Sequence, residues 1–247
     1  GKSTATAMVG LIMEQAGLDP TVVVGTKVLQ WGNNIRIGKS DWLVIEADEY
    51  HGHMLEFKPS IAAITNIAPD HLDYYKDLSD IIAHFQKWVE QMKPGGTLII
   101  NQDDSASMGL KPPTGLAVKY FAIKDKIDWG LDKLKIPGEF NIANALAAAA
   151  VAEALNIPQA AIIKALLNFQ GTWRRFEMVG QYNGALIISD YAHHPDGIKA
   201  TLGAARQKYP DQRLVLLYQP HQRNRTRRLF DEFVKSFDKV DELILAE

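Results

Sequence analysis

The chain has 247 residues, of which 47% are hydrophobic and 23% are charged, as in a globular protein with a sizeable core. Its net charge of −2, from 27 basic and 29 acidic residues, gives no overall field that would recruit nucleic acid or an anionic membrane. The absence of cysteine excludes disulfides, thiolate metal sites and a cysteine nucleophile, and it suits a reducing cytoplasm.

Short apolar strands alternate with helices through the first two thirds of the sequence. The opening residues predict a helix that ends near Gly17. Further helices are predicted at residues 78–92, 141–155 and 159–169, and strands at 21–25, 42–47, 61–67, 97–101 and 118–123. Strands rich in valine and isoleucine that alternate with helices favour a mainly parallel sheet covered on both faces.

The alternation restarts after GTWRRFE at residues 171–177, so a second α/β unit is expected from residue 178. Its predicted helices are 196–208 and 226–237, and its predicted strands are 185–191, 213–219 and 242–246. The longest apolar run, ANALAAAAVAEAL, is too short to span a bilayer, and no signal segment opens the chain. A chain that starts in a helix and stops in a strand is expected to be a piece of a longer protein.

The sequence GKST at residues 1–4 matches the end of a phosphate-binding loop. In the complete motif, backbone amides cradle the phosphates, the lysine reaches the β- and γ-phosphates, and the Ser or Thr hydroxyl coordinates magnesium. A helix that begins here favours an anion at its amino end. Because Gly-Lys-Ser alone is common, the other motifs have to decide whether this segment binds a nucleotide.

Acidic side chains and a histidine follow two successive predicted strands. IEADEY at 45–50 carries Glu46 and Asp48, and NIAPDHLDYY at 66–75 carries His71. Ligands of open α/β sheets bind outside the carboxyl ends of strands, so Ser3, Glu46 and His71 are expected to converge on one magnesium ion. The alternatives are a solvated acidic turn, and a His71 that caps a helix or lies in the core.

Other residues have two interpretations each. His51 and His53 form an HGH sequence that suggests a transition metal, but no third ligand of suitable spacing is apparent. Asn141, in the first turns of a helix, is either a cap or an amide that binds a nucleotide base. Arg174 and Arg175 are either a solvated surface pair or a means of neutralising charge on a transferred phosphoryl group.

Two further motifs, DYAHHP at 190–195 and QPHQRNRT at 219–226, follow predicted strands of the second unit. The adjacent His193 and His194 need not aim at one point. They therefore suit hydrogen bonding to a nucleotide or substrate better than a shared metal.

Together these segments resemble the Mur ligases, the ATP-dependent amide ligases of peptidoglycan assembly, and most closely the branch that joins L-alanine to UDP-N-acetylmuramate. The resemblance rests on GKST, EADEY, TNIAPDHLDYY, PGEFNIANALAA, RRFE, DYAHHPDGIKATL and QPHQRNRT, which occur in the family's order. It implies a P-loop-type ATPase domain with a mainly parallel α/β sheet over residues 1–177, lacking the start of its P-loop. A truncated Rossmann-like α/β domain over residues 178–247 would follow, and the UDP-binding domain would be absent.

The resemblance also implies roles for single residues, with ATP and Mg²⁺ as cofactors. Lys2 is expected to hold the phosphates, Ser3, Glu46 and His71 to support metal, and Arg175 to contact the γ-phosphate. Further nucleotide contacts are expected from Gly1, Thr4, Asn141, Asn144, Asp190, Tyr191 and His193, and substrate contacts from His194, His221 and Arg225. The implied partners are a UDP-sugar and an amino acid in the cytoplasm, without nucleic acid or membrane.

The sequence departs from this branch at two places and agrees with it at a third. Phe140 stands where the branch usually has histidine, and Tyr50–His51 stand where it usually has Ser-Asp. Phe85 occupies the position of a carbamylated lysine in several sister ligases, as expected for the alanine-adding branch. Alternative interpretations are a ligase that recycles murein peptides or adds glutamate to folate, or a nucleotide-binding fragment without activity. We expect the chain alone to be inactive.

Overall fold

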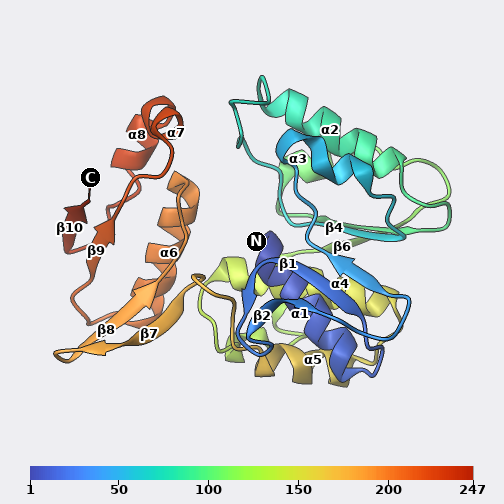
Figure 1. Cartoon of the computed structure of the whole chain (residues 1–247), viewed down its shortest axis with the longest axis horizontal. Helices are drawn as coiled ribbons and strands as arrows, with labels where there is room; N and C mark the ends of the chain where they lie inside the picture. The colour runs from blue at the N-terminus through green and yellow to red at the C-terminus, as the bar shows by residue number, and fades with distance from the viewer. Residues whose placement is uncertain (247) are drawn as a thin grey trace. The chain divides into compact units, whose positions relative to one another are not determined.

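The computed structural model describes residues 1–246, which form two compact units (Figure 1). Unit 1 comprises residues 1–135 and 141–172, and unit 2 comprises residues 136–140 and those from Trp173 onward. The division precedes the predicted boundary at 177/178, because Phe176 is buried with Ala204 and Ala205 in unit 2. No helix within residues 1–246 has the length and apolar character needed to cross a bilayer.

Unit 1 holds two separate three-stranded sheets. In the first, of order β2-β1-β3, β1 (Thr21–Val28) pairs antiparallel with β2 (Asn33–Arg36) and parallel with β3 (Leu43–Ile45). The second is wholly parallel, with β4 (Ile61–Ile64), β5 (Thr97–Asn101) and β6 (Ala117–Phe121) in that order. The predicted strands and the mainly parallel α/β class are therefore confirmed. The short polar strand β2 was not predicted, because its sequence NNIR has no apolar alternation.

Helices α1 (Lys2–Gln15) and α5 (Gln159–Asn168) lie in unit 1, as does α4 (Glu139–Ala154) from Asn141 onward. Ten residues of α1 are buried, including Ser3 and Thr4 in its first turn. Helix α4 is buried through an alanine-rich stretch, whose small side chains let neighbouring elements pack closely. Gly17 follows α1 with φ +78°, a conformation that ends a helix at little steric cost to glycine.

Helix α2 (Leu78–Glu90) and the short α3 (Ser105–Met108) accompany the β4-β5-β6 sheet (Figure 1). The buried face of α2 carries Ile81, Trp88 and Val89, which share one apolar cluster with Leu98 and Ile100 of β5. The amino end of α2 is capped by Asp77, whose side chain accepts from the Asp80 N–H at 2.9 Å. The cap of this helix is therefore Asp77, not His71. The 3₁₀ segments are η1 (Tyr50–Glu56), which is kinked at His51 and Gly52, and the shorter η2 (Ile123–Lys126) and η3 (Leu131–Lys133).

Unit 2 contains two strand pairs and a long helix. Strands β7 (Glu177–Tyr182) and β8 (Ala185–Ser189) form a hairpin whose turn is Asn183-Gly184, both with positive φ. Strand β9 (Val215–Tyr218) is parallel to β10 (Glu242–Leu245). Helix α6 (Pro195–Lys208) contributes Ile198 and Leu202 to the core with Tyr218 and Phe233.

The single helix predicted at 226–237 is wrong. The structure has two short helices, α7 (Arg223–Arg228) and α8 (Phe230–Val234). They are separated by Leu229, whose φ of −111° and ψ of 31° are not helical. Periodicity alone did not reveal this break, because residues 223–228 are all polar and the helical spacing comes from the apolar residues from Leu229 to Phe237.

Candidate functional site

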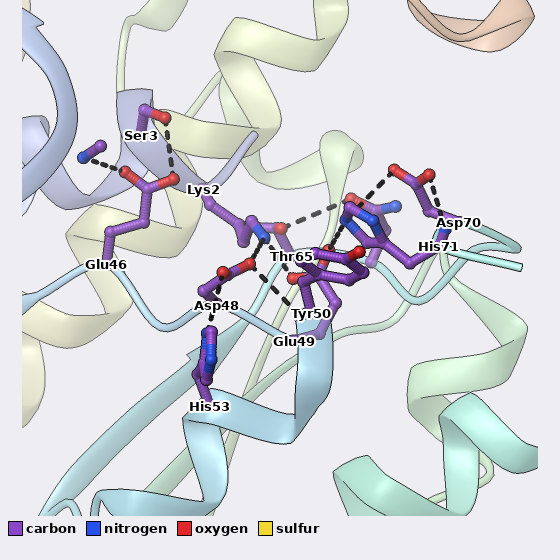
Figure 2. Close-up of polar contacts among 12 residues, drawn as sticks. Lys2, Ser3, Glu46, Asp48, Glu49, Tyr50, His53, Thr65, Asp70 and His71 are labelled. Atoms are coloured by element: carbon purple, nitrogen blue, oxygen red, sulfur yellow. Dashed lines mark hydrogen bonds and ion pairs between the residues drawn. The ribbon is translucent and has the colours of Figure 1, made fainter. Parts of the chain in front are cut away.

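The first turn of α1 carries a serine hydroxyl bonded to a carboxylate (Figure 2). Ser3 Oγ donates a hydrogen bond to Glu46 Oε1 at 2.9 Å, and the Gly25 N–H donates to Glu46 Oε2 at 2.6 Å. Glu46 directly follows β3, so the start of α1 and the end of this strand meet here. A side chain at Gly25 would collide with Glu46, since a Cβ there would lie 2.8 Å from Oε2.

Lys2 is the cation of this region, and its ammonium group lies between two carboxylates (Figure 2). It forms an ion pair with Glu49 and lies 3.5 Å from Asp48 Oδ1. The Lys2 side chain is 40% exposed. An exposed ion pair contributes little stability, so Lys2 can exchange these carboxylates for a phosphate at small cost.

His71 lies on the other side of Glu49. Its Nε2 is 3.7 Å from Glu49 Oε1 and 3.9 Å from Asp70 Oδ2, and its ring stacks on Tyr50 with centroids 4.4 Å apart. The residue has φ 52°, a left-handed conformation that is uncommon outside glycine. Its N–H donates to Asp70 Oδ1 at 2.8 Å, which holds the turn.

Two tyrosines fix the acidic segment. Tyr75 is buried, with 2% of its surface exposed, and its hydroxyl donates to the backbone carbonyl of Glu49. Burial, with the charge of Glu49, raises the pKa of Tyr75 to about 12, so the group stays a neutral donor. The hydroxyl of Tyr50 donates to Asp73 Oδ2 at 3.0 Å, and this hydrogen bond raises the pKa of Tyr50.

The donor set of the acidic segment fits a divalent cation. Asp48, Glu49 and His71 each offer one ligand atom within 4.8 Å of the others. Carboxylate oxygens are the ligands that magnesium prefers, and one imidazole completes the group. The three residues predicted to share one magnesium ion, Ser3, Glu46 and His71, do not all group together. Ser3 bonds Glu46, whereas His71 lies beside Glu49.

The two asparagines of α4 are buried near the start of α1. The Nδ2 of Asn144 donates to Asn141 Oδ1 at 3.4 Å, and each residue is 3% exposed. A Cβ at Gly1 would lie 2.7 Å from Asn144 Oδ1 and 3.3 Å from Thr65 Oγ1. Only glycine fits here without displacement, as expected where a backbone must approach a phosphate closely. Asn141 is inside α4, which begins at Glu139, so it is not the helix cap.

The HGH sequence forms part of η1. His51 has φ 53°, and its ring centroid lies 6.0 Å from that of His53. His53 Nδ1 is 3.5 Å from Asp48 Oδ2. Among residues 1–246, the histidine and acidic residues that group closely enough to hold a metal are those of the Asp48–Glu49–His71 set, without His51 or His53.

In unit 2, several predicted residues gather around Tyr191. The guanidinium carbons of Arg174 and Arg175 lie 5.0 and 5.4 Å from its ring centroid. The rings of His193 and His221 lie 4.9 and 6.3 Å from that of Tyr191. This cluster combines cationic and hydrogen-bonding groups of the kind that suit an anionic ligand.

Other predicted residues of unit 2 have structural partners. The carboxylate of Asp190 accepts from the N–H groups of Phe176 and Ala192, both at 2.7 Å, and so ties two loops together. His194 caps α6, where its Nδ1 accepts from the Asp196 N–H at 3.4 Å. Arg225 lies in α7. Phe140, the departure from the family pattern, packs against the cluster that contains Phe176.

Sequence reasoning gave no role to Glu49, Asp48 or Tyr75, which all border Lys2 or His71 in the structure. The sequence motifs already contained these residues: Asp48 and Glu49 lie in EADEY, and Tyr75 lies in DHLDYY. The assumption that Glu46 would face His71 obscured their role: Glu46 bonds Ser3, and Glu49 is the carboxylate beside His71.

Comparison with known proteins identifies both parts of the chain. The family described as "Mur ligase middle domain" matches residues 1–133, and "Mur ligase, glutamate ligase domain" matches residues 174–247. A UDP-N-acetylmuramate–L-alanine ligase of Desulfitobacterium hafniense is 37% identical over 270 residues, covering 100% of this chain and 60% of that protein. One from Clostridium kluyveri is 41% identical over 271 residues, covering 100% of the chain and 59% of the relative.

Solved structures agree with this grouping. The UDP-N-acetylmuramate–alanine ligase of Thermotoga maritima superposes with a TM-score of 0.80 at 26% identity, covering 99% of the chain and 59% of that structure. A murein peptide ligase of Psychrobacter arcticus shares the fold with a TM-score of 0.68 at 23% identity, covering 99% of the chain and 61% of that structure. The chain thus spans about 60% of the length of these relatives. It belongs to the Mur ligase family.

Proposed function

We propose that the chain forms the nucleotide-binding part of an ATP-dependent ligase that joins L-alanine to UDP-N-acetylmuramate. The observation that carries the proposal is the start of α1, where Lys2 and Ser3 lie among Glu46, Asp48 and Glu49. A lysine and a hydroxyl at a helix amino end, beside carboxylates, suit a nucleoside triphosphate with a divalent cation. The relatives whose printed names specify this reaction support the choice of substrates.

The reaction has two steps. The substrate carboxylate attacks the γ-phosphorus of ATP, and ADP leaves to give an acyl phosphate. The amine of L-alanine then attacks the carbonyl carbon, inorganic phosphate leaves, and the amine loses a proton. No protein nucleophile is required, so the protein acts by positioning the reactants and neutralising charge.

Each residue of the site has a task in this proposal. Lys2 binds the β- and γ-phosphate oxygens, after releasing Asp48 and Glu49. Magnesium would be held by Ser3 with Glu46, or by the group of Asp48, Glu49 and His71, and when bound it neutralises phosphate charge. From unit 2, Arg175 is proposed to contact the γ-phosphate, and Tyr191, His193 and His221 to contact nucleotide or substrate.

Calorimetric titration of this chain with Mg-ATP tests the nucleotide site. We expect a binding isotherm for the chain and none for Lys2→Ala, because the variant lacks the cation that meets the phosphates. The absence of binding by the unmodified chain would favour a structural fragment without nucleotide affinity.

Assay of the complete enzyme with a panel of acceptors tests the substrates. We expect phosphate release that depends on UDP-N-acetylmuramate and L-alanine together. Turnover with murein peptide or a folate instead would assign the chain to a related ligase and overturn the proposed substrates.

A further inference from the structure

Tyr50 connects the two segments that supply the candidate metal ligands. Asp48 and Glu49 follow β3, whereas His71 follows β4, a strand of the other three-stranded sheet. Tyr50 is next to Glu49 in the chain, and its ring contacts His71 (Figure 2). Ligands from two separate sheets have to be aligned with each other before one cation can contact them all. Tyr50 lies where that alignment is made.

The imidazole of His71 is not fixed by hydrogen bonds. Its Nε2 lies 3.7 Å from Glu49 Oε1 and 3.9 Å from Asp70 Oδ2, and both distances exceed hydrogen-bond length. Within residues 1–246, the hydrogen bonds of His71 are made by its backbone N–H and C=O and not by its ring. A metal-binding histidine is usually oriented by a hydrogen bond from its second ring nitrogen. His71 needs another source of orientation.

The ring of Tyr50 supplies a restraint of a different kind. The two ring centroids are 4.4 Å apart and the ring planes differ by 28°, so the tyrosine and the imidazole are stacked. The imidazole cannot turn out of this arrangement without losing the contact. The stack therefore fixes the plane in which Nε2 of His71 points.

The ring of Tyr50 is itself held at two points. Its hydroxyl donates to Asp73 Oδ2 at 3.0 Å, and Asp73 is two residues beyond His71. One edge of the ring packs against His51, with centroids 4.2 Å apart and planes at 63°. A ring that is held at its tip and at its edge can support the imidazole stacked on its face.

The backbone of Tyr50 contacts a second member of the set. Its N–H lies 3.3 Å from Asp48 Oδ1, to which it donates. Tyr50 thus bonds Asp48 through its main chain, stacks on His71 through its side chain, and directly follows Glu49. By contrast, the hydroxyl of Tyr75 bonds the Glu49 carbonyl and so fixes the main chain of that segment, not the imidazole.

We propose that Tyr50 is a positioning residue that holds the imidazole of His71 against Asp48 and Glu49. Their three ligand atoms then lie within 4.8 Å of one another, close enough for one divalent cation. This inference rests on the proposed function, because it takes these residues as cation ligands. The stacked ring takes the place of the hydrogen bond that orients a ligating histidine elsewhere. Because the ring carries the effect, phenylalanine can replace Tyr50 and an aliphatic residue cannot.

Titration of this chain with Mn²⁺ in the absence of nucleotide tests the proposal. Mn²⁺ accepts the oxygen ligands that suit magnesium, and the free ion is counted by electron paramagnetic resonance. We expect Tyr50→Leu to weaken Mn²⁺ binding by about tenfold or more, the range found for residues that orient a metal ligand. Tyr50→Met, a second variant without the ring, should do the same. Tyr50→Phe keeps the stack and should bind Mn²⁺ nearly as well as the parent.

Tyr74→Leu is the matched control. Tyr74 belongs to the same group of rings, with its centroid 4.7 Å from that of His51, and it is 42% exposed. Its recorded ring contacts do not include His71. We expect this variant to keep the Mn²⁺ affinity of the parent. Circular dichroism and urea midpoints establish that each variant is folded.

A double-mutant cycle separates positioning from a general structural role. We expect Tyr50→Leu to have little further effect on Mn²⁺ affinity in a His71→Ala background, because its effect passes through the imidazole. A tyrosine that only stabilises the fold would weaken Mn²⁺ binding equally in both backgrounds. The backbone N–H that bonds Asp48 is retained in every variant, so the cycle measures the side chain alone.

Several results would overturn the proposal. Unchanged Mn²⁺ affinity in Tyr50→Leu and Tyr50→Met would show that the ring does not orient His71. An equal loss in Tyr74→Leu, or a loss in Tyr50→Phe as large as in Tyr50→Leu, would contradict the role of the stack. So would an equal effect in the His71→Ala background, or no Mn²⁺ binding by the parent. None of these measurements uses nucleotide, so the Mg-ATP titration of the proposed ligase succeeds or fails separately.

Discussion

The hydroxyl of Ser3 and the carboxylate of Glu46 are bonded at 2.9 Å, although 43 residues separate them in the chain. The same carboxylate accepts the Gly25 N–H, so Glu46 fixes the first turn of α1 against β1 and the end of β3. Lys2, next to Ser3, faces the other way toward Asp48 and Glu49. In the first turn of α1, the Ser3 hydroxyl therefore faces Glu46, and the Lys2 ammonium faces the separate pair of Asp48 and Glu49.

The first prediction concerns Lys2. In the complete enzyme, Lys2→Ala should lower turnover by about 100-fold or more, since loss of one well-placed charge contact to a transition state costs about 3–4 kcal/mol. Folding should be retained, because the Lys2 side chain is 40% exposed. Steady-state kinetics and circular dichroism measure the two effects. Lys124→Ala, at an exposed lysine of η2, is the matched control. A Lys2→Ala rate within about tenfold of the parent would contradict the assignment.

The second prediction separates the two possible metal sets. If Glu49 and His71 hold the ion, Glu49→Gln should raise the magnesium concentration for half-maximal activity by about tenfold or more, because one anionic oxygen is lost. If Ser3 and Glu46 hold it, Glu46→Gln should have that effect instead. Titration of activity with magnesium at saturating ATP gives the measurement, and Glu56→Gln, at the exposed end of η1, is the control. Unchanged magnesium dependence in both variants would exclude both sets.

The third prediction concerns the buried hydroxyl of Tyr75. Tyr75→Phe removes the donor to the Glu49 carbonyl and leaves that acceptor unsatisfied in a site where the ring is 2% exposed. The free energy of unfolding should fall by about 1–3 kcal/mol, measured by urea denaturation. Tyr120→Phe, at a tyrosine that is 49% exposed, should have little effect. Equal stability of the Tyr75 variant and the parent would mean that the hydroxyl makes no net contribution.

The fourth prediction is a pH dependence. The hydrogen bond from Arg36 holds the pKa of Asp19 below the ordinary value of an aspartate side chain. The folded-state pKa is depressed, so the stabilisation is complete above the unfolded value and is lost as the pH falls through the folded one. Asp19→Asn should therefore destabilise unit 1 at pH 6, with a difference that shrinks toward pH 3. Asparagine also tolerates the φ of 43° at this position, so the backbone is not strained by the change.

Tryptophan fluorescence suits this measurement, because Trp31, Trp42, Trp88 and Trp129 all lie in unit 1. Urea midpoints of parent and variant are compared at several pH values between 3 and 6. Asp128→Asn, at an exposed aspartate, is the control. A difference between Asp19→Asn and the parent that is constant over this range would contradict the proposed linkage.

Much of the fold follows from local sequence. The apolar runs that became β1, β4 and β5 and the periodicity of α2 specify these elements through short-range burial patterns, which one sequence displays directly. The motif GKST likewise placed Lys2 and Ser3 at a helix start. By contrast, the polar strand β2 escaped prediction because it has no apolar alternation, and the break at Leu229 escaped prediction because the apolar residues from Leu229 onward keep helical spacing.

The sequence by itself determined which chemical groups are available at the carboxyl ends of β3 and β4: three carboxylates in EADEY and a histidine in DHLD. Only the tertiary structure decided their pairing. Glu46 turns back to Ser3 and Gly25, while Glu49, whose carbonyl is held by the Tyr75 hydroxyl, lies beside the imidazole of His71, a residue with left-handed backbone. The physical reason is that side-chain direction alternates predictably within a strand, but beyond its end it depends on turns fixed by distant partners such as Tyr75.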